Sequence, residues 1–150
     1  MAQAEQDGWS LRAVARGAGL SLGSVRNLMR AELGLLERGA LGPADVLCVR
    51  VLAELGANRS TNRGSLDERT AALLRRDREA VELVRAAYRD GLDTSTRLLV
   101  RTDRCWLARK DLEVLTALDD EPGQSLRVLP LGRWANELTV TAPAPVSRAA

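Results

Sequence analysis

Residues 11–30, LRAVARGAGLSLGSVRNLMR, decide the fold of the N-terminal part of this chain. Apolar residues recur at helical spacing on both sides of Gly19, which predicts two short amphipathic helices joined by a tight turn. Ser10 and Ser21 stand where helix N-caps are needed, and Gly19 supplies the positive φ of the turn. The residues expected to pack the two helices together are Val14, Ala15, Ala18, Leu20, Val25 and Leu28. The pattern predicts a helix-turn-helix pair.

The outward side of this pair carries four arginines and no acid. Arginine can bind guanine bidentately and asparagine can do the same to adenine, while a glycine in the first helical turn permits close approach of the backbone to a phosphate. The expected DNA-contacting residues, including one from a following loop, are Arg12, Arg16, Ser21, Gly23, Ser24, Arg26, Asn27, Arg30 and Arg38. The alternative is a helical hairpin of another all-α protein, whose arginines are merely solvated.

Composition limits the possible functions. The chain has 150 residues, is 45% hydrophobic and carries a net charge of +2, so its positive charge is local to residues 11–30. Of its 22 basic residues only Lys110 is a lysine. The planar guanidinium of arginine binds phosphates and base edges with two hydrogen bonds at once, which the lysine ammonium does not do. No apolar run approaches a membrane span, and residues 1–8 are polar. We expect a cytoplasmic, nucleoid-associated protein with no membrane partner.

The residues that usually carry catalysis or bind metals are scarce. The chain has no histidine, and its two cysteines, Cys48 and Cys105, are separated by 57 positions. A disulfide, a zinc site and a cofactor are therefore not expected, and Cys48 is expected to be a core residue. We predict that the protein is not an enzyme; the weakest alternative, an enzyme, would depend on Cys105 or a pair of carboxylates.

Two more helices are expected in the middle of the chain. The segment 43–55 begins with proline, is apolar on most sides and stops at Gly56. We expect it to form a buried helix on which the rest of the N-terminal unit packs. Residues 65–68, SLDE, form a capping box that predicts a long helix ending at Gly91. Its Leu74, Val81 and Tyr88 are spaced by seven, as in a dimerising coiled coil, but the same spacing suits a helix that packs on its own chain.

The periodicity changes after Gly91. Residues 96–102 and 105–110 predict a β-hairpin, 111–120 a short helix capped by Asp111, and 125–131 a third strand. Residues 132–140 are either helix or strand. This ββαβ unit has Trp106 and Trp134 as expected core anchors, the alternative being an aromatic-lined pocket for a small ligand.

The whole chain is therefore expected to be α+β and mainly α. The predicted segments are a helix-turn-helix domain (1–57), a linker with the dimerisation helix (58–92), the small C-terminal unit (93–140) and a disordered tail (141–150).

The stretches 11–28, GLL at 34–36 and LGPADVLCVRVLAELG at 41–56 together resemble the N-terminal winged helix-turn-helix domain of the MerR superfamily. The resemblance covers residues 9–57 and implies a dimeric DNA-binding transcription factor, with the helix after Ser21 as recognition helix and the helix 66–90 pairing with its dimer mate. Two features depart from the family: residues 26–34 form a longer stretch, and Arg38 is the only base in the expected wing.

The sequence thus predicts a sequence-specific transcriptional regulator that binds double-stranded DNA as a homodimer, on a roughly palindromic site. The departures leave open a related class, the excisionase-like architectural factors that bend DNA. A third alternative is a protein-interaction module in which residues 66–150 bind a protein partner and DNA contact is auxiliary.

Overall fold

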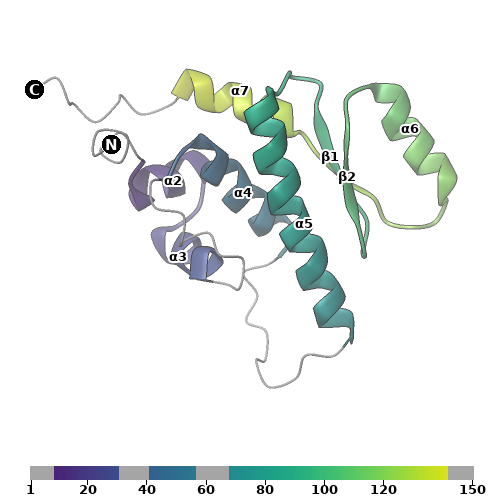
Figure 1. Ribbon diagram of the computed structural model, residues 1–150, viewed down its shortest axis with the longest axis horizontal. Helices are drawn as coiled ribbons and strands as arrows, with labels where there is room; N and C mark the ends of the chain where they lie inside the picture. Colours follow the sequence, from purple (N-terminus) through teal and green to yellow (C-terminus); the bar gives the residue numbers. More distant parts are fainter. Residues whose placement is uncertain (1–8, 31–40, 57–67, 142–150) are drawn as a thin grey trace, which may run out of the picture.

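The computed structural model describes residues 9–30, 41–56 and 68–141, which are mainly helical with one small antiparallel sheet (Figure 1). This confirms the predicted α+β, mainly α class. In chain order the elements are α2 (Leu11–Ala18), α3 (Leu22–Arg30), α4 (Pro43–Glu54), α5 (Glu68–Asp90), β1 (Arg97–Val100), β2 (Cys105–Ala108), α6 (Asp111–Asp120), β3 (Arg127–Leu129) and α7 (Leu131–Thr141).

Helices α2 and α3 begin and end where the sequence predicts. The Ser10 hydroxyl accepts a hydrogen bond from the Ala13 amide at 3.1 Å, and Ser21 does the same for the Ser24 amide at 3.1 Å. Gly19 ends α2 in the left-handed region at φ 71°, where a side chain would be strained. The apolar residues expected between the helices are buried, apart from the half-buried Leu20.

Helix α4 lies at the centre of the described structure and contacts α2, α3, α5 and α7. Its first turn is closed by Asp45, whose carboxylate accepts from the Gly42 amide at 2.7 Å, and Gly56 follows its end with φ 76°. Cys48 is fully buried, as predicted. Arg50 lies 4.2 Å over the Trp134 ring and pairs with Glu137 of α7 at 3.4 Å.

The long helix α5 packs along one side on its own chain. Ala80, Val81, Val84 and Ala87 are buried in the main core, and Arg85 pairs with Asp45 of α4 at 2.7 Å. Of the residues in the predicted dimerising stripe, Val81 is buried, Leu74 is half-buried and Tyr88 is 39% exposed, so the three do not form one continuous exposed stripe in the described structure. The helix ends before Gly91, as expected, whereas the predicted capping residue Ser65 lies outside the described residues.

The three strands form an antiparallel sheet in the order β2-β1-β3, so the predicted ββαβ unit is present. Leu98, Val100 and Leu129 point from one face into the main core, while Leu99 and Ala108 point from the other face toward Ala117 of α6. The sheet therefore lies between α5 and α6, as Figure 1 shows. Asp111 is the first residue of α6 and not, as predicted, its N-cap. Lys110 occupies the N-cap position, and its side chain makes no capping hydrogen bond.

Residues 131–141 form a helix, which settles the choice left open for 132–140. Gly132 at its start is required by space: a Cβ there would lie 1.7 Å from the Asp93 carbonyl oxygen, and the Gly132 amide donates to the Thr96 carbonyl at 2.8 Å. Trp134 is buried, as predicted, whereas Trp106 is only half-buried. Residues 142–150, assigned to the expected tail, lie outside the described residues, and Thr141 still belongs to α7.

One main core joins all of the described elements except α6, which packs in a second, smaller cluster on the other face of the sheet. The main core runs from Val14 and Val25 through α4 and α5 to Leu98, Leu131 and Leu138. The predicted boundaries at residues 57 and 92 therefore do not separate independent cores within the described ranges. Among the described helices, none combines the length and the apolar character that a membrane span requires.

Candidate nucleic-acid interface

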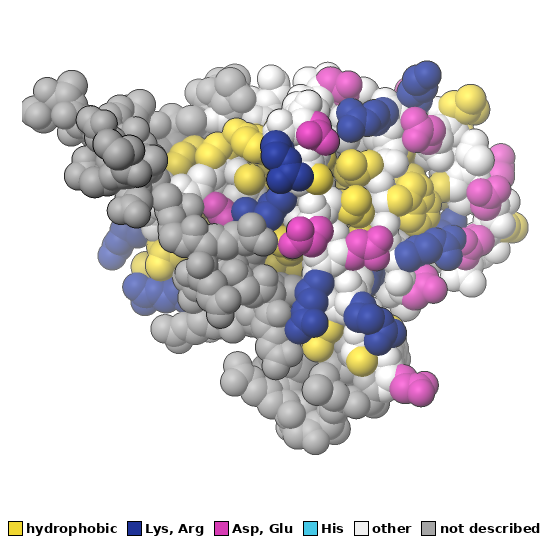
Figure 2. All heavy atoms as spheres, viewed as in Figure 1, with side chains coloured by type: hydrophobic (Ala, Val, Ile, Leu, Met, Phe, Trp, Pro, Cys, Tyr) yellow, Lys and Arg dark blue, Asp and Glu magenta, His cyan; other side chains and the backbone are white. Residues whose placement is uncertain are grey.

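The surface formed by α2 and α3 carries most of the residues expected to contact DNA. Arg12, Arg16, Arg26 and Asn27 are exposed, as are Ser21 and Gly23, and Ser24 is half-buried. In Figure 2, basic side chains lie at the edge of the molecule that α2 and α3 occupy in Figure 1. The side chain of Arg30 and the whole of Arg38 lie outside the described structure. We call this surface the α2–α3 face.

The α2–α3 face is held from below by close packing. Val14, Val25 and Leu28 are completely buried. Gly17 is a further determinant that the sequence analysis missed: a Cβ at this position would lie 3.0 Å from Val46 Cγ1 and 3.3 Å from Leu138 Cδ2. A glycine in the middle of a short helix was the available signal, since glycine is otherwise unfavourable there. The small residue lets α2 approach α4, and this fixes which side of α2 faces outward.

The first turn of α3 uses its serines locally. Ser21 accepts from the Ser24 amide and donates its own hydroxyl hydrogen to Ser24 Oγ at 2.9 Å. Ser21 is therefore first a capping residue, and its hydroxyl is already satisfied. Ser24, which receives that bond, donates its hydroxyl hydrogen to no acceptor among the described residues and can offer it to an outside oxygen.

Gly23 is not required by the fold. A Cβ built at this position meets no atom within 4 Å, and its φ is not positive. Glycine in a helical turn costs about 0.5–1 kcal/mol relative to alanine. Glycine at this position therefore lowers stability, and no contact within the described structure requires it. A group from outside the protein that approaches the backbone closely would account for the presence of glycine here.

The exposed arginines of the α2–α3 face have no protein partner within the described part of the chain. Residues 9–30 contain no acid, and neither an ion pair nor a hydrogen bond links Arg12, Arg16 or Arg26 to another described side chain. Many arginines from α4 onward are engaged instead. Those with an acid, a carbonyl or both as partner are Arg50, Arg76, Arg85, Arg97, Arg101, Arg104 and Arg127.

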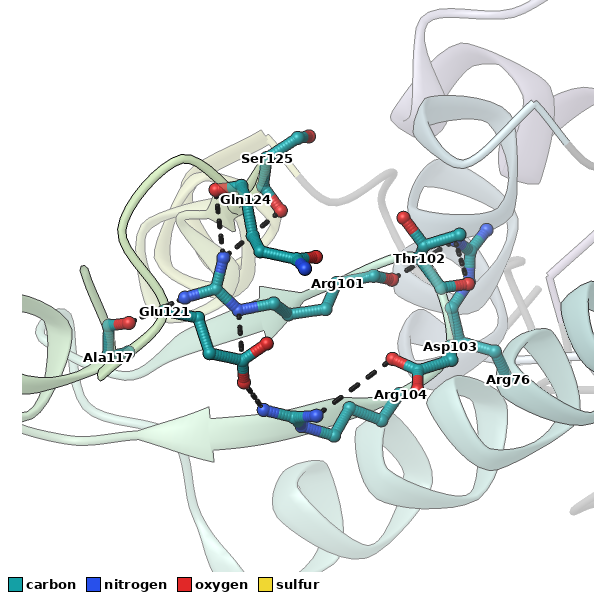
Figure 3. A network of polar contacts seen from close by, with 9 residues as sticks. All are labelled: Arg76, Arg101, Thr102, Asp103, Arg104, Ala117, Glu121, Gln124 and Ser125. Atoms are coloured by element: carbon teal, nitrogen blue, oxygen red, sulfur yellow. Dashed lines mark hydrogen bonds and ion pairs between the residues drawn. The ribbon is translucent and has the colours of Figure 1, made fainter. Parts of the chain in front are cut away.

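Figure 3 shows the most extensive of these contacts, around the β1–β2 turn. Arg101 is 3% exposed and donates to the carbonyl oxygens of Ala117, Gln124 and Ser125. Arg76 donates to the carbonyls of Arg101 and Thr102, both at 3.2 Å. These guanidinium groups close loops of their own chain, so they are not available to a nucleic acid.

The described residues offer little for catalysis. Burial, with a smaller contribution from Glu79, raises the pKa of the Cys105 thiol to about 12, so it is protonated at neutral pH. Cys48 and Cys105 are both buried and unbridged. No cluster of three histidine, cysteine or carboxylate side chains suited to a metal occurs in the described ranges.

The alternative of an aromatic-lined pocket is not realised around both tryptophans. A groove of about 590 Å³ runs beside β2 and is lined by Trp106, Arg104 and residues of α5 and α6. Trp134 is not part of it, because its ring packs in the main core beneath Arg50.

Comparisons of the chain with family models, with curated proteins and with solved structures give no match. The inference of function therefore depends on the chemistry of the α2–α3 face.

Proposed function

We propose that this protein is a sequence-specific DNA-binding transcriptional regulator that acts as a homodimer and inserts α3 into the major groove. The observation that carries the proposal is the α2–α3 face itself, where exposed arginines stand on two short helices and pair with no acid among the described residues. Positive charge without an internal partner is the electrostatic requirement for binding a polyanion.

Each residue of the face has a role that follows from its place. Arg26 and Asn27 lie along α3, where they would contact base edges in the groove. Arg12 and Arg16 lie on α2, which would cross the backbone, so these side chains would bind phosphates. The open surface at Gly23 would admit a phosphate, and the amides at the start of α3 would donate hydrogen bonds to its oxygen. Arg30 and Arg38 keep their expected contributions as proposals.

The resemblance of residues 9–57 to the MerR superfamily agrees with this proposal and suggests two copies on a palindromic site. Since Val81, in the middle of the predicted α5 seam, is buried in its own chain, we place the contact with the second copy elsewhere.

The experiment that tests the proposal is selection of bound fragments from a random pool of double-stranded DNA by the full-length protein. We expect enrichment of a short motif repeated as a palindrome with constrained spacing. An unselective pool would support the architectural, excisionase-like alternative instead. Absence of binding even at low salt would refute DNA binding altogether.

A protein-docking function with auxiliary DNA contact is the second candidate, because α6 exposes several leucines. Variants in cells separate the two functions. If regulation of DNA is primary, Arg26→Ala reproduces the phenotype of deleting the gene. If docking is primary, Arg26→Ala leaves the phenotype unchanged and Leu115→Glu reproduces the deletion.

A further inference from the structure

Helix α6 exposes an apolar side that nothing in the described structure covers. Leu112 is 71% exposed, Leu115 57% and Leu118 46%, and their spacing of three places them along one side of the helix. Val114 and Ala117 point to the other side, where they pack over the sheet. We call the three leucines the α6 stripe. Figure 2 shows hydrophobic side chains reaching the surface in this part of the molecule.

Charge is distributed unequally along the helix that carries the α6 stripe. The exposed basic residues Arg109 and Lys110 precede its first turn, where Asp111 is paired with Arg97 at 2.6 Å and Glu113 is a second exposed acid. The exposed acids Asp119 and Asp120 form its last turn, which contains no base. The first end of the stripe therefore has more bases than acids around it, and the last turn carries acids alone.

This asymmetry favours one occupant of the stripe. A second α6 running antiparallel brings the basic end of each helix to the acidic end of the other, and the helix dipoles are then opposed favourably. A parallel arrangement would place like charges together. An antiparallel arrangement about a two-fold axis also sets Leu112 of one copy beside Leu118 of the other, with Leu115 at the axis.

We propose that two copies of this chain associate through antiparallel pairing of their α6 stripes. This inference deepens the homodimer part of the proposed function by naming its interface. Helix α6 lies at the opposite end of the molecule from α2 and α3 in Figure 1, so both α2–α3 faces stay open in such a dimer. The predicted seam on α5 is interrupted by the buried Val81, whereas the α6 stripe is exposed along its whole length.

The first test measures the oligomeric state of the full-length protein without DNA, by sedimentation equilibrium over a range of concentrations. Leu115→Glu is expected to raise the dissociation constant of the dimer at least about 100-fold, because each copy loses a buried leucine at the axis. Tyr88→Ser is the matched control: it removes another exposed apolar side chain, on α5, and should leave the constant unchanged. A monomeric parent protein, or a dimer indifferent to Leu115→Glu, would overturn the proposal.

The second test reverses the charges. Lys110→Glu alone and Asp119→Lys alone should each weaken the dimer about tenfold, and the two together should restore it, because the end-to-end attraction is re-formed with opposite sign. Both changes favour the helix dipole of α6, so unfolding of the helix cannot account for a loss. A double variant no better than the single variants would contradict the antiparallel arrangement.

The two proposals fail separately. A dimer that selects a palindromic DNA motif but is indifferent to Leu115→Glu refutes only the α6 interface, whereas a dimer sensitive to Leu115→Glu that binds no DNA refutes only the proposed function.

Discussion

Arginine side chains have different surroundings at the two ends of this molecule. On the α2–α3 face, Arg12, Arg16 and Arg26 are exposed, and residues 9–30, which carry them, contain no acid. Around the β1–β2 turn, Arg76 and Arg101 are buried and hold backbone carbonyls of neighbouring loops. The difference teaches that the count of arginines indicates no function by itself. What distinguishes a binding arginine from a structural one is whether its donors are already used.

The largest effect is expected at the structural end. Arg101→Ala would leave the carbonyls of Ala117, Gln124 and Ser125 without their donor inside the protein. We expect the free energy of unfolding to fall by about 3–5 kcal/mol, measured by urea denaturation. Arg133→Ala, at an exposed arginine of α7, is the control and should change it by less than about 0.5 kcal/mol. Equal effects of the two variants would contradict the comparison.

The buried end should also respond to alkaline pH. The Cys105 thiol ionises only near pH 12 in the folded protein but near its ordinary pKa of 9.0 once unfolded. Its contribution to stability is complete below pH 9 and is lost as the pH rises toward 12, by up to about 1.4 kcal/mol per pH unit. Urea denaturation at several pH values should show that Cys105→Ala is less sensitive to this rise. Parallel curves for the two proteins would contradict the buried thiol.

On the α2–α3 face, where we propose that DNA binds, arginine-to-alanine substitutions should leave the free energy of unfolding almost unchanged. Arg26→Ala is expected to weaken binding to the selected DNA by about 1–3 kcal/mol and to relax its base preference, with the free energy of unfolding within about 0.5 kcal/mol of the parent. Arg16→Ala should weaken binding to every sequence and lower the salt dependence by about one unit of slope. Fluorescence anisotropy on selected and random duplexes measures both. Equal losses on the two duplexes for Arg26→Ala would refute its role in base recognition.

The smallest expected effect sharpens the comparison most. Gly23→Ala adds a methyl group that meets no atom of the described residues, so it should raise the free energy of unfolding by up to about 1 kcal/mol. If a phosphate approaches the backbone there, the same variant binds DNA more weakly while being more stable. Thermal denaturation and anisotropy on one sample give both values. Unchanged or tighter DNA binding would show that nothing approaches Gly23.

Local features were predictable because a few neighbouring residues determine them. Ser10, Ser21 and Gly19 act within three or four positions of themselves, and their caps and turn form as the sequence indicates. The outward side of α2 and α3 followed from helical periodicity alone. The sequence could not show that Ser21 and Ser24 satisfy each other, or that the space around Gly23 is empty.

Long-range choices were not predictable, because the same local pattern fits more than one partner. A spacing of seven on α5 suits a second copy or α4 equally, and the choice depends on the Asp45–Arg85 pair, 40 positions apart. The sequence of residues 132–140 is compatible with helix or strand. In the structure these residues are helical, and Trp134 packs beneath Arg50 of α4, a contact between residues far apart in the chain.

The central place of α4 makes this a chain that resists recombination. Helix α4 contacts α2 and α3 before it and α5 and α7 after it. A division of the chain near residue 57 therefore leaves neither half with a complete hydrophobic core. A chimaera that joins residues 9–56 to another effector domain would expose the apolar side of α4 that α5 and α7 cover in this protein. New specificities in such a protein are therefore expected to arise by replacement of individual side chains on an intact scaffold, and not by exchange of modules.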